Sequence, residues 1–152
     1  MSLSEEMSEL ARRARLASRR LTSLSTGEKN NCLQAMADAI EANAEFIQEE
    51  NAKDMDAGAA SGLSKSLLDR LLLNGARIEG MVTSLREVSK LPDPVGRVIE
   101  ERTRPNGLKL TKIATPIGVI VIIYESRPNV TADAASLCFK SGNATILRGG
   151  KE

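Results

Sequence analysis

Two short polar segments of this chain could do chemistry, and each directly follows an apolar stretch typical of a buried strand. The first is Tyr-Glu-Ser-Arg at 124–127 and the second is Arg-Gly-Gly-Lys at 148–151. Together they offer two guanidinium groups, an ammonium group, a carboxylate and a glycine pair, which suits them to bind a phosphate or a carboxylate. Taken singly such residues are more often solvated, so the prediction depends on both segments meeting at one edge of a sheet.

Composition excludes several kinds of catalysis. The chain has no histidine, which rules out Ser-His and Cys-His catalysis by its own residues. Cys32 and Cys138 are far apart, cannot form a zinc site, and are predicted to be small core residues of two helices. Neither a G-x-G-x-x-G nor a P-loop motif occurs, so the common nucleotide-binding fingerprints are missing. We predict no catalytic residue and no metal site in the chain.

Charge and hydropathy favour neither a nucleic-acid nor a membrane partner. The net charge is +1 and aromatic residues make up 2% of the chain, which leaves little to attract phosphates or to stack on bases. No stretch reaches the roughly 18 to 20 apolar residues of a membrane span. Arginines cluster near the N-terminus, but Glu5, Glu6 and Glu9 accompany them, which predicts a solvated helix face rather than a transit peptide. We expect a cytoplasmic protein.

The first 90 residues are predicted to be helical, because apolar side chains recur there at every third or fourth position. Ser2 with Glu5 and Ser25 with Glu28 have the spacing of capping boxes and are predicted to start the first two helices. Asn43 is predicted to cap a third helix.

Glycine and proline predict where the later helices end. The Gly-Ala-Ala-Ser-Gly cluster at 58–62 predicts a break after the third helix. A fourth helix, rich in leucine, is predicted to end near Asn74-Gly75. A fifth is predicted to stop before Leu-Pro-Asp-Pro at 91–94, where two prolines make a continued helix very costly.

A β-hairpin is predicted after these helices. Residues 97–103 and 108–114 alternate with a period of two and are joined across Pro105, Asn106 and Gly107. Asn-Gly between two such runs is a strong hairpin signal.

The last part of the chain predicts a βαβ unit. Residues 117–124 are typical of a strand buried on both faces, 129–141 of a helix that Gly142 ends, and 144–147 of a second strand. Strands connected in this way are parallel, and the connection is right-handed. The fold class is therefore α/β, but two strands are fewer than a doubly wound domain needs. We expect the chain to be a fragment; strands supplied from elsewhere are the alternative.

Several segments have the motifs of a known enzyme family. They are Asp-Arg-Leu-Leu-Leu at 69–73, Arg-Ile-Glu-Gly-Met at 77–81, Leu-Pro-Asp-Pro-Val-Gly at 91–96, Thr-Pro-Ile-Gly-Val-Ile at 115–120, Tyr-Glu-Ser-Arg-Pro-Asn-Val-Thr at 124–131, and Lys-Ser-Gly-Asn at 140–143 running into Leu-Arg-Gly-Gly at 147–150. These segments resemble the gamma-glutamyl phosphate reductase family of the aldehyde dehydrogenase superfamily. The segment at 125–131 is specific, whereas Pro-x-Gly-Val at 116–119 is shared across aldehyde dehydrogenases.

The resemblance implies an aldehyde-dehydrogenase-like α/β fold with N-terminal helices, a β-hairpin arm and the first βαβ unit of a doubly wound parallel sheet. Residues 1–96 would form the helical segment of the cofactor-binding domain, 97–114 an oligomerisation arm, and 115–152 the start of a Rossmann-like NADP-binding sheet. The chain would be an N-terminal portion, with the domain of the nucleophilic cysteine lying downstream.

The implied activity is the NADPH-dependent reduction of L-glutamate 5-phosphate to L-glutamate 5-semialdehyde with release of phosphate, in proline biosynthesis. In the family a cysteine thiolate attacks the acyl phosphate, and the thioacyl enzyme accepts a hydride from NADPH. Neither Cys32 nor Cys138 matches the motif of that cysteine.

Site residues and partners are also implied by the resemblance. Residues expected to contact NADP(H) are Ile123, Tyr124, Glu125, Arg148, Gly149, Gly150 and Lys151. Arg127 and Asn129 are expected to contact the substrate. The expected partners are L-glutamate 5-phosphate, further copies of the chain in a homo-oligomer and, through functional coupling, glutamate 5-kinase.

Three alternatives stay open on the sequence alone. The segment could belong to the reductase half of a bifunctional pyrroline-5-carboxylate synthase, or to an aldehyde dehydrogenase for another semialdehyde. The third is a non-catalytic, self-associating helical module with an accessory βαβ unit. We predict no reductase turnover from these 152 residues alone.

Overall fold

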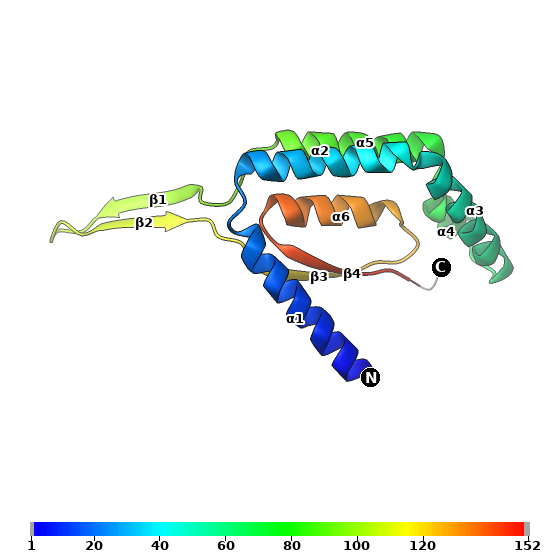
Figure 1. Ribbon diagram of the computed structural model, residues 1–152, viewed down its shortest axis with the longest axis horizontal. Coiled ribbons are helices and arrows are strands. Elements are labelled where there is room, and N and C mark those ends of the chain that lie inside the picture. The colour runs from blue at the N-terminus through cyan, green and yellow to red at the C-terminus, as the bar shows by residue number, and fades with distance from the viewer. Residues whose placement is uncertain (1, 151–152) are drawn as a thin grey trace.

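The computed structural model describes residues 2–150. Its elements are α1 (Leu3–Leu21), α2 (Thr26–Ala42), α3 (Ala44–Ala60), α4 (Lys65–Leu71), α5 (Gly75–Lys90), β1 (Val98–Thr103), β2 (Lys109–Ile113), β3 (Val119–Ile123), α6 (Asn129–Lys140) and β4 (Ala144–Arg148). Helix α6 lies between the α2/α5 pair and the two-stranded sheet of β3 and β4, while the β1–β2 hairpin projects away from the body (Figure 1). Within the described residues, no helix is both long and apolar enough to cross a membrane.

The predicted helix starts are confirmed at α1 and α2. Ser2 with Glu5 and Ser25 with Glu28 form complete capping boxes. Asn43 does precede α3, but the prediction that its side chain caps that helix is wrong. Its Nδ2 donates instead to the carbonyl of Ala39, at 2.7 Å. Only Asn43 separates α2 from α3. Its side chain donates to a free carbonyl at the end of α2 rather than accepting from a free N–H at the start of α3.

Helix α3 ends at Ala60, inside the cluster at 58–62 that was predicted to end it, and Gly58 itself is still helical. A Cβ atom on Gly58 would lie 2.9 Å from Cδ1 of Leu63 and 3.3 Å from side-chain atoms of Leu68 and Leu71. The glycine therefore makes room for the leucines of the α4 region. The chain reverses at Gly62, whose φ of +82° suits glycine.

The core forms where α2 and α5 pack together and α6 packs beneath them (Figure 1). Its buried centre consists of Leu33, Ala37, Val82, Leu85 and Val88, with Ile40, Ala132 and Phe139 packed against it. A buried aliphatic side chain contributes about 1.5 to 3 kcal/mol, so this cluster is the main stabilising feature. Cys138 of α6 is buried as predicted, but Cys32 of α2 is exposed, contrary to the prediction. Helical geometry turns Cys32 about 100° away from its buried neighbour Leu33.

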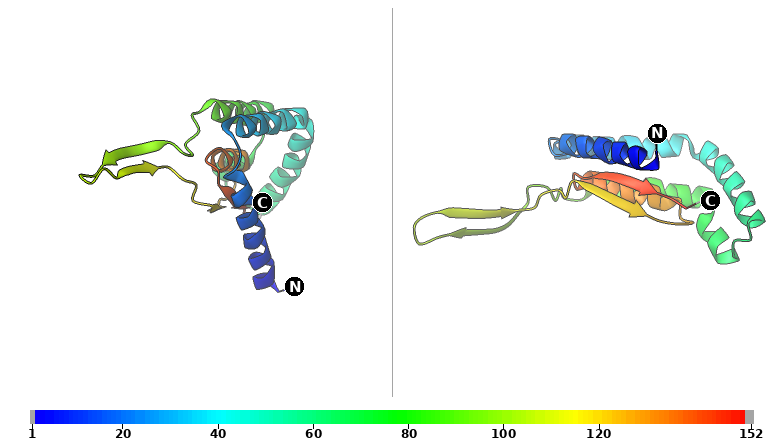
Figure 2. Two further views of the ribbon diagram at one scale, coloured as in Figure 1. Left: turned by 60° about the vertical axis from the view of Figure 1, so that its left-hand side comes forward. Right: turned by 90° about the horizontal axis from the view of Figure 1, so that it is seen from below.

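The predicted hairpin is confirmed. Strands β1 and β2 pair antiparallel, and the backbone N–H of Arg104 donates to the carbonyl of Leu108 across the loop, at 2.9 Å. Gly107 takes the φ of +85° that the turn requires. Every residue of β1 is exposed, and Figure 2 shows that the hairpin extends well beyond the other elements.

The predicted βαβ unit is also confirmed, with β3 and β4 parallel and paired from Val119 with Ala144 to Ile123 with Arg148. The prediction that β3 is buried on both faces is wrong for this chain, because Val121 is 60% and Ile123 is 77% exposed. These alternate side chains point away from the face that α6 covers, and α1, which packs mainly on β4, leaves Val121 and Ile123 exposed.

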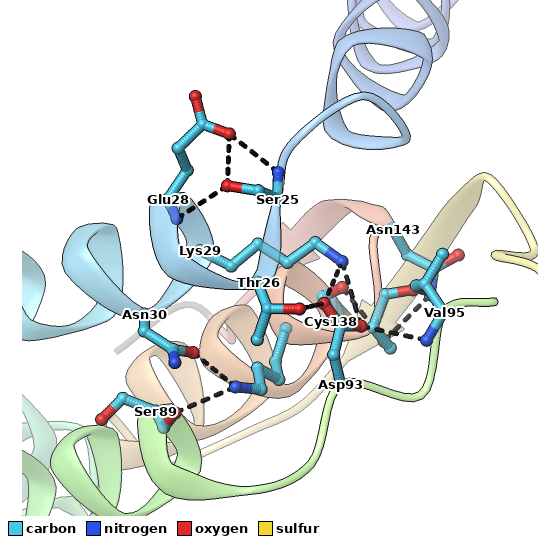
Figure 3. A network of polar contacts seen from close by, with 12 residues as sticks. Ser25, Thr26, Glu28, Lys29, Asn30, Ser89, Asp93, Val95, Cys138 and Asn143 are labelled. Atoms are coloured by element: carbon cyan, nitrogen blue, oxygen red, sulfur yellow. Dashed lines mark hydrogen bonds and ion pairs between the residues drawn. The ribbon is translucent and has the colours of Figure 1, made fainter. Parts of the chain in front are cut away.

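A buried polar network joins α2, α6 and the linker between α5 and β1 (Figure 3). Lys29 Nζ donates to both carboxylate oxygens of Asp93, at 3.1 and 2.9 Å. The Thr26 hydroxyl and the Val95 N–H donate to the same carboxylate, each at 3.0 Å. Burial acts to raise the pKa of Asp93, but the hydrogen bonds outweigh it, so the pKa lies below its ordinary value. Asp93 therefore holds the base of the hairpin as a charged group.

Lys140, at the end of α6, completes this network from the other side. Its Nζ donates to Asn30 Oδ1 at 2.5 Å and to the carbonyl of Ser89 at 2.9 Å. Burial lowers the pKa of Lys140. The Lys-Ser-Gly-Asn segment that begins here is thus structural, and Asn143 uses its Oδ1 to accept from the N–H of Gly118, which ties the start of β4 to the start of β3.

Candidate functional site

The two predicted binding segments meet at one edge of the sheet. Ile123 and Arg148 are partners at the carboxyl ends of β3 and β4. The N–H of Tyr124 donates to the carbonyl of Arg148 at 3.0 Å, which extends the pairing by one residue. The carboxyl edge of a parallel sheet is where ligands bind in open α/β folds.

A cavity of about 650 Å³, which we call the strand-end cavity, opens at this edge. It is lined by six of the seven residues predicted to contact a nucleotide: Ile123, Tyr124, Glu125, Arg148, Gly149 and Gly150. The seventh, Lys151, lies outside the described residues. The opposite wall comes from the end of α3 and the turn after it, namely Ala57, Gly58, Ser61 and Leu63. That wall was not foreseen, because it depends on how α3 packs across the sheet edge.

The side chains of the strand-end cavity are held by local contacts. The Tyr124 hydroxyl lies 2.5 Å from Oγ1 of Thr131, which fixes the ring against α6. Arg148 Nη1 donates to the carbonyls of Gly149 and Gly150, at 2.6 and 3.3 Å. Among the described residues, a Cβ atom on Gly149 would meet only the Tyr124 ring, at 3.9 Å. Gly149 thus leaves its backbone open to the cavity although the fold itself would accept a side chain.

Ser126 separates the first segment into two parts. It is buried and has a φ of +47°, the only positive φ of a non-glycine residue among residues 2–150. Such a conformation costs on the order of 1 to 3 kcal/mol, and it is found where function constrains the backbone. Arg127 lines a different cavity from Arg148. The expectation that the two guanidinium groups share one site is therefore wrong, because the turn at Ser126 sends them to different sides of the chain.

The second cavity, of about 480 Å³, lies beside the first turn of α6, and we call it the α6 cavity. Arg127 and Asn129, the two residues predicted to contact substrate, both line it. The other lining residues come from the α4–α5 region and from α6: Asp69, Arg70, Arg77, Gly80, Met81, Ser84 and Asp133.

Asn129 is oriented by contacts within the α6 cavity. Its Nδ2 donates to Oδ2 of Asp133 at 3.1 Å, and the Ser84 hydroxyl donates to Oδ1 of the same carboxylate at 3.2 Å. An ionised carboxylate only accepts hydrogen bonds, so the amide nitrogen of Asn129 must face Asp133. Within the part of the chain that the structure describes, one N–H and the carbonyl oxygen of this amide have no partner and can bind a ligand.

Sequence reasoning missed Arg70, Arg77, Ser84 and Asp133. The Asn129–Asp133 contact has the i, i+4 spacing of helix neighbours, so it could have been found. The residues of α4 and α5 could not, because they reach the α6 cavity only through tertiary packing.

Comparison with known proteins adds to this geometry. The chain is 58% identical over 146 residues to gamma-glutamyl phosphate reductase of Paramagnetospirillum magneticum, covering 96% of the chain and 34% of the relative. It is 55% identical over 152 residues to the same enzyme of Moorella thermoacetica, covering 100% of the chain and 36% of the relative. The chain is a homologue of gamma-glutamyl phosphate reductase. It spans about a third of the length of these relatives.

Solved structures agree with this relationship. The crystal structure of gamma-glutamyl phosphate reductase from Thermotoga maritima superposes with a TM-score of 0.90 at 42% identity, over 93% of the chain and 34% of that protein. The Saccharomyces cerevisiae reductase gives 0.91 at 41% identity, over 99% and 38%. A probable aldehyde dehydrogenase from Listeria monocytogenes, 17% identical with a TM-score of 0.63 over 97% and 30%, shares the fold. The expected aldehyde-dehydrogenase-like fold is thereby confirmed. No protein-family model matches the chain.

Proposed function

We propose that the chain is part of an NADPH-dependent enzyme that reduces L-glutamate 5-phosphate to L-glutamate 5-semialdehyde and releases phosphate in proline biosynthesis. The observation that carries this proposal is 55 to 58% identity to two reductases over almost the whole chain. The nucleophile belongs to the part of the enzyme that this chain does not span. Neither Cys32, exposed on α2, nor buried Cys138 lines either of the two cavities described above.

The strand-end cavity is proposed to hold part of NADP(H), which supplies the hydride when bound. Its residues fit such a ligand, because Gly149 exposes backbone where a Cβ atom would stand. Arg148 offers a guanidinium group beside it. Ile123 presents an exposed apolar side chain, and apolar walls with a few polar groups are typical of cofactor sites.

The α6 cavity is proposed to hold the substrate. The guanidinium group of Arg127 can pair with a phosphate or a carboxylate. The N–H of Asn129 that Asp133 leaves free can donate to the oxygen of the acyl group, which stabilises negative charge developing there. Hydride transfer requires direct approach of donor and acceptor, so the part of NADP(H) that carries the hydride would extend from the strand-end cavity past the β3–α6 loop at 124–128 to the acyl group.

The β1–β2 hairpin is proposed to be an arm that pairs with a second copy of the chain in a homo-oligomer. Val98, Ile99 and Ile113 are exposed on it, and a projecting two-stranded hairpin leaves unpaired strand edges. In this assignment residues 1–96 and 115–152 belong to the NADP-binding domain and 97–114 to the arm. A cytoplasmic location and functional coupling to glutamate 5-kinase accompany the proposed activity.

A second candidate is a non-catalytic, self-associating module, which the exposed hairpin favours. The other enzymatic alternative, an aldehyde dehydrogenase for another semialdehyde, is disfavoured by 17% identity to a probable aldehyde dehydrogenase against 41 and 42% to two reductases.

The nucleotide assignment is tested by Gly149→Val in the complete enzyme. Within residues 2–150 a Cβ atom here meets only the Tyr124 ring, so the variant should fold, while its added methyl groups enter the strand-end cavity. We expect the KM for NADPH to rise about tenfold or more, with the KM for the acyl phosphate unchanged. Gly75→Ala is the control, because nothing lies within 4 Å of its Cβ position and it lines neither cavity. An unchanged KM for NADPH in Gly149→Val would remove the nucleotide from this cavity.

A further inference from the structure

The α6 cavity carries more positive charge than its internal pairs neutralise. Three arginines and two aspartates line it. Arg77 is neutralised, because its Nη2 lies 2.9 Å from Oδ1 of Asp69. Asp133 accepts hydrogen bonds from Ser84 and Asn129, and neither donor is charged.

Arg70 and Arg127 are the lining cations that have no ion pair and no side-chain hydrogen bond within residues 2–150. They come from different elements, Arg70 from α4 and Arg127 from the β3–α6 loop. Both arginines are exposed, and with the Asp133 carboxylate on the same wall the cavity has a net charge of +1 that an anion between the arginines would offset. Their chemistry thus matches a ligand with at least one anionic group.

The backbone that carries Arg70 is clamped from two sides. On one side the buried amide of Asn51, 4% exposed, donates from Nδ2 to the carbonyl of Leu71 at 2.9 Å and accepts from the N–H of Leu73 at 2.6 Å. On the other side Arg77 Nη1 donates to the carbonyls of Asp69 and Leu72.

These clamps matter because α4 has only seven residues, and a helix of this length is not stable by itself. Four hydrogen bonds to backbone groups of residues 69–73 fix the short segment that carries Arg70. A guanidinium group on a fixed backbone loses less freedom when it binds, which strengthens binding.

We propose that Arg70 is a further substrate-binding residue, which binds an anionic group of the substrate opposite Arg127 in the α6 cavity. The proposal rests on the proposed function and extends it. An acyl phosphate of glutamate has two anionic groups, the phosphate and the α-carboxylate. Both have the planar or forked oxygen geometry that a guanidinium group pairs with through two hydrogen bonds. The kinetic test tells which of the two Arg70 binds.

The test uses the complete enzyme in the reverse direction, where phosphate, glutamate 5-semialdehyde and NADP⁺ have separate KM values. A hydrogen bond to a charged group contributes about 1.5 to 3 kcal/mol, so Arg70→Met should raise one KM about 10- to 100-fold. A higher KM for phosphate assigns Arg70 to the phosphate, and a higher KM for the semialdehyde assigns it to the α-carboxylate. The KM for NADP⁺ should stay within about twofold, and Arg70→Lys should recover part of the loss.

The matched control is Arg19→Met on α1, an exposed arginine outside the α6 cavity, which should leave all three KM values unchanged. The role is overturned if Arg70→Met leaves the phosphate and semialdehyde KM values unchanged. It is equally overturned if the variant changes all three KM values together with a lower melting temperature, because that result marks a structural role. A wild-type enzyme without turnover would remove the proposed function and this role with it.

Discussion

The ion pair between Lys29 and Asp93 should respond unequally to loss of either partner. The Lys29 side chain is 2% exposed, and the Asp93 carboxylate is its only side-chain partner within residues 2–150. Asp93 is 12% exposed and has two further donors, the Thr26 hydroxyl and the Val95 N–H. The lysine therefore depends on the aspartate more than the aspartate depends on the lysine.

The magnitudes follow from what each substitution leaves behind. Asp93→Ala leaves a buried ammonium group without a partner, which costs about 3 to 5 kcal/mol of unfolding free energy. Lys29→Met leaves a carboxylate that still accepts two hydrogen bonds, and the cost should be about 1 to 3 kcal/mol. The double variant removes the buried ammonium as well, so we expect it to be more stable than Asp93→Ala alone.

Urea unfolding of the chain at pH 7, followed by circular dichroism and extrapolated linearly, measures these differences. Arg19→Met serves as the control, because an exposed substitution on α1 should change stability by about 0.5 kcal/mol or less. If Lys29→Met costs as much as Asp93→Ala, or if the double variant is the least stable of the three, the asymmetry derived from these contacts is refuted.

Four other substitutions test the same structure. Hydrogen bonds hold the pKa of Asp93 below its ordinary value of 3.8. The stability that the charged Asp93 contributes is therefore complete above pH 3.8 and is lost as the pH falls through the pKa of the folded state. Asp93→Asn should flatten the fall in unfolding free energy between about pH 5 and pH 2. Burial lowers the pKa of Lys140 below 10.5, so the folded state releases this proton first. The unfolding free energy of the wild type, compared with Lys140→Met, should therefore rise as the pH approaches 10.5, and a fall would contradict the burial argument. Gly58→Ala should cost about 1 to 3 kcal/mol, because the new Cβ atom lies 2.9 Å from Leu63 Cδ1. Gly80→Ala, in open space on α5, should stabilise by about 0.5 to 1 kcal/mol, and similar thermal shifts for both glycine variants would refute the packing argument.

Local signals in the sequence predicted most elements. The capping boxes at Ser2 and Ser25 start helices, and the two prolines after Leu91 end α5, because each effect is confined to one turn of backbone. The cluster at 58–62 likewise ends α3, at Ala60. The sequence does not show the second role of Gly58, which stays helical and leaves space for three leucines of a later segment.

The apolar pattern of β3 predicted that both faces of the strand are buried, but one face is partly exposed in this chain. Val121 and Ile123 are exposed because α6 covers the opposite face of the sheet and α1 packs mainly on β4 rather than β3. Hydrophobic patterns indicate that a surface is to be covered, but they do not tell whether the covering element lies within the same segment.

The candidate site was half predictable. Residues at the carboxyl ends of two parallel strands must meet, so the strand-end cavity followed from topology. The separation of Arg127 from Arg148 did not, because it depends on the positive φ of Ser126, a conformation that serine rarely adopts and that no local pattern signals. Arg70 joins the α6 cavity from 57 positions before Arg127, through helix packing that sequence periodicity does not specify.

The most direct test of the account is the rate of NADP⁺ reduction by the complete enzyme with glutamate 5-semialdehyde, followed at 340 nm with and without phosphate. We predict turnover that requires phosphate and is absent from the 152-residue chain alone. Turnover independent of phosphate would indicate an aldehyde dehydrogenase for a different reaction. Steady phosphate-dependent turnover by the isolated chain would contradict the claim that the nucleophile lies outside it.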